Sequence, residues 1–248
     1  MAILTQFALR LTFGLALGMA LTNPRQVTSG YYRNHLYVLL GLCVLATMVA
    51  LTAPEHFALA PPLVAAGLSY VGSAAWLYEK PRFGIACLWL IAAVSLAGAW
   101  AAMSVPTADA PAAVALAWLG APTSGLVLGL TMAAMFLGHW YLNSPTMVIE
   151  PLARLVGLMA VAVCLRALVE GGNLALLLSR EWPTTDVWLF IALRWLSGIV
   201  GALAVAAMAW QTLKIPNTQS ATGILYVGVI VTFLGELISM LMAAQTGS

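Results

Sequence analysis

Long apolar runs alternate with short polar segments along the whole chain. Eight runs hold about 20 mostly apolar residues, the length that crosses a bilayer core of ~30 Å as a helix. Backbone polar groups need partners inside lipid, so runs of this length predict helices. The runs cover residues 2–22, 35–53, 57–78, 83–103, 115–142, 152–170, 186–211 and 219–243. We therefore predict an all-α integral membrane protein with eight transmembrane helices.

Turn signals separate these runs. Pro, Gly, Asn and charged residues mark each boundary, and the longest stretch predicted outside the membrane runs from Gly171 to Thr185. All prolines fall in loops or near the ends of the runs, and we expect Pro122 to open its helix. Broken helices, which form ion and substrate sites in many transporters, are therefore not indicated.

Composition agrees with this pattern and excludes several classes of protein. Of the 248 residues, 62% are hydrophobic and 7% charged, whereas soluble domains carry roughly a quarter charged residues. A net charge of +2 with scattered basic residues argues against nucleic acid as a partner. Cys43, Cys87 and Cys164 lie in apolar runs without metal or redox spacing, so we predict no metal site and interpret them as buried hydrophobic residues.

The basic residues gather on one side of the predicted spans. That side holds Arg25, Arg33, Lys80, Arg82, Arg154 and Lys214, and the other side holds only Arg180. Because cytoplasmic loops are enriched in Lys and Arg, we expect both termini on the non-cytoplasmic side of the cytoplasmic (inner) membrane.

An internal repeat relates the two halves of this single membrane domain (1–248), namely 1–110 and 111–248. Trp76 precedes Lys80 at the end of the third run as Trp210 precedes Lys214 at the end of the seventh. Four spans separate the copies, which makes the repeat parallel. We expect two similar four-helix bundles.

Two glycine pairs favour close helix contact. Gly14 and Gly18 in the first run, and Gly125 and Gly129 in the fifth, follow the small-xxx-small pattern that lets backbones approach.

Charged residues inside the membrane are rare and face protein or water. Arg10, Arg194 and Glu236 lie about eight residues, or ~12 Å, inside the outer ends of their spans. Arg166 is about one turn inside its span, with Glu170 one turn further. These charges are expected to share one depth in the outer leaflet.

Two interpretations of these charges remain open. In the first, Arg166 pairs with Glu170, Arg194 pairs with Glu236, and Arg10 extends outward toward water. In the second, the same residues line a polar pocket that binds quinone, with Glu236 as proton acceptor and an arginine stabilising the negative charge of the reduced forms. The second makes the protein a quinone-site subunit, with no catalytic residue of its own assigned.

Two histidines at the inner side offer a further possibility. His139 ends the fifth run and His35 opens the second, both among tyrosines and tryptophans that fit an interfacial belt. They could be axial ligands of a b-type haem, although His35 stands in a polar Arg-Asn-His stretch, which disfavours haem.

The last two spans resemble the NrfD, polysulfide reductase and dimethyl sulfoxide reductase membrane-anchor families. The residues that carry the resemblance are Arg194-Trp-Leu-Ser-Gly198, Thr222 to Gly228, and Leu234-Gly-Glu-Leu237, within about 50 residues. The resemblance implies eight spans in two bundles, electron exchange with quinone, no haem, and docking of an iron–sulfur subunit. No quinone residue of those families matches position by position. The favoured hypothesis is a quinone-interacting anchor of a redox complex; the alternatives are a transporter or channel for a small solute or anion, and a structural or assembly subunit.

Overall fold

The computed structural model describes residues 2–52, 59–103, 111–144, 146–180, 182–215 and 217–246, and these residues are helical throughout apart from short connections. The elements are α1 (Ala2–Leu21), α2 (Ser29–Leu51), α3 (Ala60–Leu77), α4 (Pro81–Ala101), α5 (Pro111–Asn143), α6 (Glu150–Arg180), α7 (Thr185–Arg194), η1 (Trp195–Gly201), α8 (Ala202–Lys214) and α9 (Thr218–Thr246). The π-helix η1 joins α7 to α8 without a break, so these three elements form one rod.

The length and apolar composition of the helices support the prediction of an integral membrane protein. Seven segments of the described residues are long and apolar enough to cross a bilayer: Ile3–Leu21, Ser29–Leu51, Pro81–Ala101, Pro111–Asn143, Glu150–Ser179, Thr185–Lys214 and Thr218–Ala244. The helix α3 is not among them.

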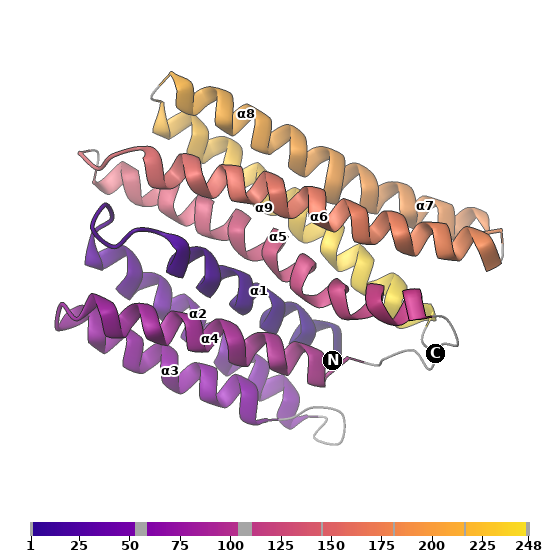
Figure 1. Cartoon of the computed structure of the whole chain (residues 1–248), viewed down its shortest axis with the longest axis horizontal. Coiled ribbons are helices and arrows are strands. Elements are labelled where there is room, and N and C mark those ends of the chain that lie inside the picture. Colours follow the sequence, from indigo (N-terminus) through magenta and orange to yellow (C-terminus); the bar gives the residue numbers. More distant parts are fainter. Residues whose placement is uncertain are drawn as a thin grey trace.

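The helices pack as two groups of four rods. In the first group α1, α2, α3 and α4 each contact the next, and α4 returns to α1. In the second group α5 contacts α6, α6 contacts α8, α8 contacts α9, and α9 returns to α5. Figure 1 shows the two groups side by side, with α1 and α5 meeting between them.

A glycine seam joins the two groups. A Cβ on Gly14 would collide with the Gly125 backbone, and one on Gly129 would collide with the Gly14 backbone. The backbones of α1 and α5 are therefore in direct contact, which confirms that these glycines permit close helix packing.

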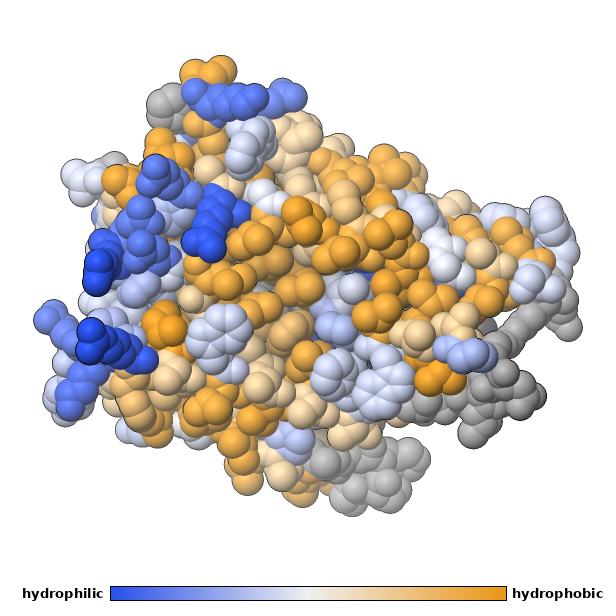
Figure 2. Space-filling view, viewed as in Figure 1, coloured by the Kyte–Doolittle hydropathy of each residue, from blue (hydrophilic) through white to orange (hydrophobic). Residues whose placement is uncertain are grey.

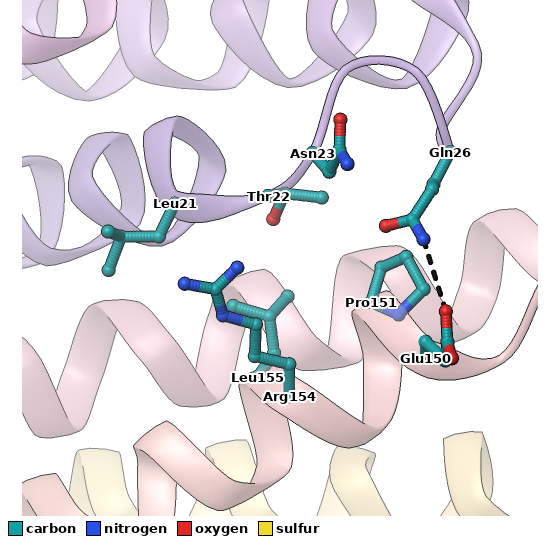
Figure 3. A pocket seen from close by; sticks show the side chains of 8 residues that line it. All are labelled: Leu21, Thr22, Asn23, Gln26, Glu150, Pro151, Arg154 and Leu155. Carbon is teal, nitrogen blue, oxygen red and sulfur yellow. Dashed lines mark hydrogen bonds between the residues drawn. The ribbon is translucent and has the colours of Figure 1, made fainter.

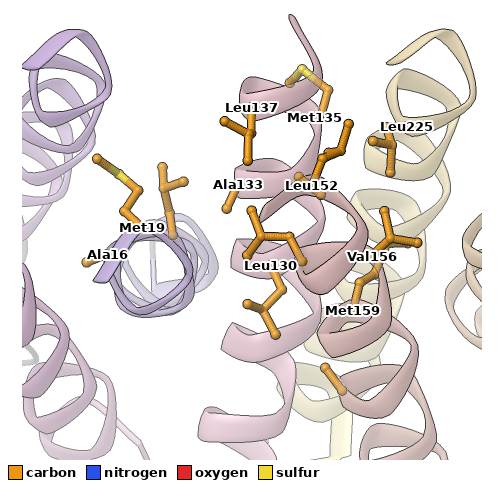
Figure 4. Packing of buried hydrophobic residues seen from close by; sticks show 14 of the residues in the cluster. Ala16, Met19, Leu130, Ala133, Met135, Leu137, Leu152, Val156, Met159 and Leu225 are labelled. Atoms are coloured by element: carbon orange, nitrogen blue, oxygen red, sulfur yellow. The ribbon is translucent and has the colours of Figure 1, made fainter. Parts of the chain in front are cut away.

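The apolar core continues across this seam. One cluster contains Ala16 and Met19 of α1, Leu130 and Ala133 of α5, and Leu225 of α9, and Figure 4 shows these residues on their neighbouring helices. Because these side chains are almost fully buried, they bind the two groups into one body.

Polar residues concentrate at one end of the molecule. Figure 2 shows an apolar belt over the middle of the surface and a hydrophilic group at the left, the end where α1 turns into α2 in Figure 1. Many large apolar side chains of the described residues are exposed, including Leu63, Leu168 and Ile230. Such a surface is suited to contact with lipid.

Three sequence expectations about these helices were wrong. The helix α6 continues through the predicted loop to Arg180, because Gly172 lets Leu116 of α5 pack against the α6 backbone. Pro122 lies inside α5 and does not open it. Cys164 is exposed on the outside of α6, whereas Cys43 and Cys87 are buried as predicted.

The turn from α3 to α4 holds a residue in the left-handed region. Glu79 has φ 54°, which lets the Lys80 N–H donate to the Ala75 carbonyl at 2.9 Å and closes the end of α3. This conformation costs a non-glycine residue roughly 1–2 kcal/mol, and glycine is the usual residue there.

We expect Glu79→Gly to raise the midpoint of thermal unfolding in detergent, by relieving about 1 kcal/mol of this strain. Glu79→Ala removes the same exposed carboxylate but keeps a Cβ, so it should give no gain. An equal effect of both substitutions would contradict the strain.

Candidate functional site: an ion network between α6, α7 and α9

Arg166 of α6 is the centre of a buried network of charges. Its Nε and Nη2 donate to the two carboxylate oxygens of Glu236 on α9, at 2.8 and 2.9 Å. Its Nη1 donates to the Gly120 carbonyl of α5 at 3.3 Å. Arg166 and Glu236 are each 3% exposed, so this two-point pair lies away from both water and lipid.

Glu170, one turn further along α6, bridges two arginines. Its Oε1 lies 2.7 Å from Arg166 Nη2, and its Oε2 lies 2.8 Å from Arg194 Nη1 of α7. Ser239 of α9 accepts a hydrogen bond from Arg166 at 3.0 Å and donates one to Glu170 at 3.2 Å. Four side chains of alternating charge therefore follow one another from α9 through α6 to α7.

This pairing partly matches the sequence prediction. The i,i+4 pair of Arg166 and Glu170 is confirmed, but the expected pair of Arg194 with Glu236 is wrong. Arg194 contacts Glu170 instead, because Arg166 already occupies both oxygens of Glu236.

Arg10 lies beside this network without a hydrogen bond to it. Its Nε donates to Gln6 Oε1 at 3.1 Å, and Gln6 Nε2 donates to the Ala99 carbonyl of α4 at 2.9 Å. Arg10 is near enough to interact electrostatically with Arg166, Glu236 and Glu170. The side chain therefore runs toward the N-terminal end of α1, as expected, but Gln6 holds it within the protein.

Three polar atoms at the α7 side of the network are left without a hydrogen bond to any described residue. Arg194 Nε and Trp195 Nε1 are buried donors, and Glu170 Oε2 meets Arg194 as a charge contact without hydrogen-bond geometry. Buried donors without acceptors are destabilising by roughly 1–3 kcal/mol each. Such groups in a native protein call for an explanation, and a ligand is one.

An irregular backbone accompanies these atoms. The π-helix η1 begins at Trp195, directly after Arg194, and π-helical turns are rare and frequent at functional sites. A Cβ on Gly235 would collide with the backbone of Gly198 in η1. This contact brings α9 against η1 beside Glu236, and so positions both arms of the network.

The network lies deep along its helices. Arg166 is about 14 residues, or ~21 Å, from the end of α6 at Arg180, and not one turn as the sequence suggested. Arg194 is nine residues, or ~14 Å, from the start of α7 at Thr185, and Glu236 is ten residues, or ~15 Å, from the end of α9 at Thr246. The contacts bring Arg166, Glu170, Arg194 and Glu236 together, while their common depth in the outer leaflet stays a prediction.

The sequence analysis did not identify three polar residues in or beside the network. Ser239, Gln6 and Trp195 take no part in the predicted pairs, although Ser239 is one turn from Glu236 and Gln6 one turn from Arg10. Helical spacing could have indicated Ser239 and Gln6 as partners of these charged residues. No sequence signal indicated Trp195, because the only notable feature of its side chain is a buried donor without an acceptor.

The two histidines engage different partners. His35 Nδ1 donates to the Tyr31 carbonyl at 2.6 Å, and the ring packs on Phe136 with centroids 4.4 Å apart. His139 contacts the Tyr226 hydroxyl at 3.1 Å. Among the described residues no group of three or more His, Cys, Asp or Glu side chains is placed to hold a metal ion.

Comparison of the chain with protein-family profiles, with curated proteins and with solved structures finds no match.

Proposed function

We propose that the protein is the quinone-binding membrane subunit of a multi-subunit redox complex. The observation that carries this proposal is the set of buried atoms without hydrogen bonds at Arg194, Trp195 and Glu170. They combine two donors with one carboxylate oxygen at membrane depth, which suits a ligand that is apolar overall and carries carbonyl oxygens.

The two unpaired N–H donors would recognise the oxidised form of the ligand, the quinone. Arg194 Nε and Trp195 Nε1 come from consecutive residues, and both would donate to a quinone carbonyl. The charge on Arg194 would also stabilise the negative charge that develops as the oxygen is reduced. Leu193 and Leu196, exposed on the same rod, would contact the ring and the isoprenoid tail.

Glu170 and Glu236 are the two candidate proton acceptors in this scheme. Both oxygens of Glu236 accept hydrogen bonds from Arg166, and Glu170 lies between Arg166 and Arg194, nearer to the unpaired donors of Arg194 and Trp195. Quinol oxidation releases two electrons and two protons. The two electrons would pass to a partner subunit, and the two protons would pass one after the other through Glu170 toward the α6 end at Arg180.

The arrangement of the chain in the membrane forms part of the proposal. We infer that α3 is an eighth crossing, because it packs between α2 and α4. The same order of contacts in both halves supports a parallel repeat. The basic end faces the cytoplasm in this scheme, and an iron–sulfur subunit is the expected partner, in line with the sequence resemblance.

Trp195→Phe tests the site, because this substitution removes the unpaired donor and little else. We expect the Kd of a short-chain quinone, measured by calorimetry in detergent, to rise about 2- to 10-fold, the value of one hydrogen bond. Trp100→Phe is the matched control, since Trp100 Nε1 already donates to the Trp118 carbonyl. It should leave the Kd unchanged.

Two outcomes would contradict the proposal. Wild-type protein that binds neither benzoquinone nor naphthoquinone, and co-purifies with no other subunit, would indicate a structural role for the ion network. Equal Kd values for Trp195→Phe and wild type would remove Trp195 from the site. Mass spectrometry of lipids extracted from the purified protein provides an independent measurement.

A further inference from the structure

A cavity of about 240 Å³ opens at the basic end of the molecule, where the turn after α1 meets the first turn of α6. Its polar lining consists of Thr22, Asn23, Gln26, Glu150 and Arg154. Figure 3 shows that these side chains come from both groups of helices. The cavity therefore lies at the junction of the two halves, far along α6 from the ion network.

The two charged residues of the cavity are held apart. Glu150 and Arg154 are four residues apart on α6, a spacing that ordinarily allows an ion pair. Here Glu150 Oε2 accepts a hydrogen bond from Gln26 Nε2 at 3.1 Å. In Figure 3 the Arg154 guanidinium points instead toward Thr22, and it has no hydrogen bond or ion pair with any described residue. One cation and one anion thus face the same cavity from different sides.

The position of the cavity and its apolar lining indicate the kind of ligand. The helix α1 ends at Leu21 and α6 begins at Glu150, so the cavity lies at the depth of lipid headgroups. Leu21, Pro151 and Leu155 add apolar lining to the cavity. Drug-sized ligands occupy about 300–1,000 Å³, so this smaller space suits a headgroup whose acyl chains run along the outside of the helices.

We propose that this cavity binds a phosphoethanolamine headgroup, with the phosphate on Arg154 and the ammonium on Glu150. An arginine is well matched to phosphate oxygens. The primary ammonium carries three donors for the carboxylate oxygen that Gln26 leaves free. A trimethylated ammonium has no donor, and a glycerol headgroup has no cation, so both should bind more weakly. This site is independent of the proposed quinone site.

Thermal unfolding of the delipidated protein in detergent tests the site. Added phosphatidylethanolamine should stabilise the wild type at about tenfold lower concentration than phosphatidylcholine or phosphatidylglycerol, a difference expected for one charge-assisted interaction. Arg154→Gln should abolish stabilisation by phosphatidylethanolamine at that concentration, and by the other two lipids at the higher concentration that stabilises the wild type. Glu150→Gln keeps an acceptor for Gln26 and should remove only the preference for phosphatidylethanolamine.

The controls separate this site from the basic surface and from the quinone site. Lys214→Gln removes an exposed cation at the same end of the molecule and should behave as wild type, as should Trp195→Phe. Stabilisation by water-soluble phosphoethanolamine would identify a soluble ligand of the same chemistry, and stabilisation by the lipid alone would identify the membrane as the source. Equal responses of wild type and Arg154→Gln, or equal responses of the wild type to the three lipids, would overturn the proposal.

Discussion

Gly129→Ala is expected to weaken the packing of the two halves severely. The added Cβ would collide with the backbone of Gly14, and no rotamer change can relieve a backbone contact. Overpacking of this kind destabilises by typically 1–3 kcal/mol and occasionally more; we expect about 3 kcal/mol. The measurement is thermal unfolding in detergent, together with the yield of monodisperse protein.

Gly41→Ala is the matched control for this experiment. Gly41 also lies within a helix, but a Cβ there would meet nothing within 4 Å. Alanine is favoured over glycine in helices by up to about 1 kcal/mol, so the control should be neutral or slightly stabilising. Opposite signs for the two substitutions are the expected result, and a neutral Gly129→Ala would mean that α1 and α5 are further apart than described.

Arg166→Met should be the most damaging substitution in the ion network. It leaves both oxygens of Glu236 without their donor in a site that is 3% exposed. Removal of one partner of a buried ion pair destabilises by about 3–5 kcal/mol, because the other charge stays buried and unpaired. We expect low yield and a markedly lower unfolding midpoint.

A second substitution keeps this prediction testable. In the double variant Arg166→Met, Glu236→Met the unpaired carboxylate is gone, while Glu170 retains Arg194 and Ser239. Much of the lost stability should return. Arg82→Gln, which removes an exposed arginine, should change stability by less than about 1 kcal/mol. A double variant no better than Arg166→Met would show that the loss came from packing around the guanidinium.

The number and approximate positions of the helices could be predicted from the apolar runs in the sequence, but the end of α6 could not. All eight predicted runs correspond to rods, because lipid tolerates no unpaired backbone. The end of α6 was not predictable, since Gly171, Gly172 and Asn173 are turn residues in most contexts. Here Gly172 admits Leu116 with a would-be Cβ contact of 2.9 Å, so tertiary packing overrides the local preference.

The candidate site was also predictable only in part. The pair of Arg166 and Glu170 follows from helical spacing, which the sequence contains. The choice of Glu236 by Arg166, and of Glu170 by Arg194, depends on how α6 and α9 are rotated against each other. It depends as well on how the rod that carries Arg194 sits against α9, which contacts such as Gly198 of η1 against Gly235 of α9 determine, and these partners are distant in sequence. The unpaired donors at Arg194 and Trp195 could be recognised only once every neighbour was in place.

The glycine seam also bears on how the protein is made. The most extensive packing of α1 is with α5, which is synthesised only after α2, α3 and α4. Until α5 is made, the bare backbone at Gly14 lacks the helix that covers it in the folded protein. The packing of α1 is therefore completed late in synthesis, and a chain that stops before α5 would lack the seam that joins the two groups.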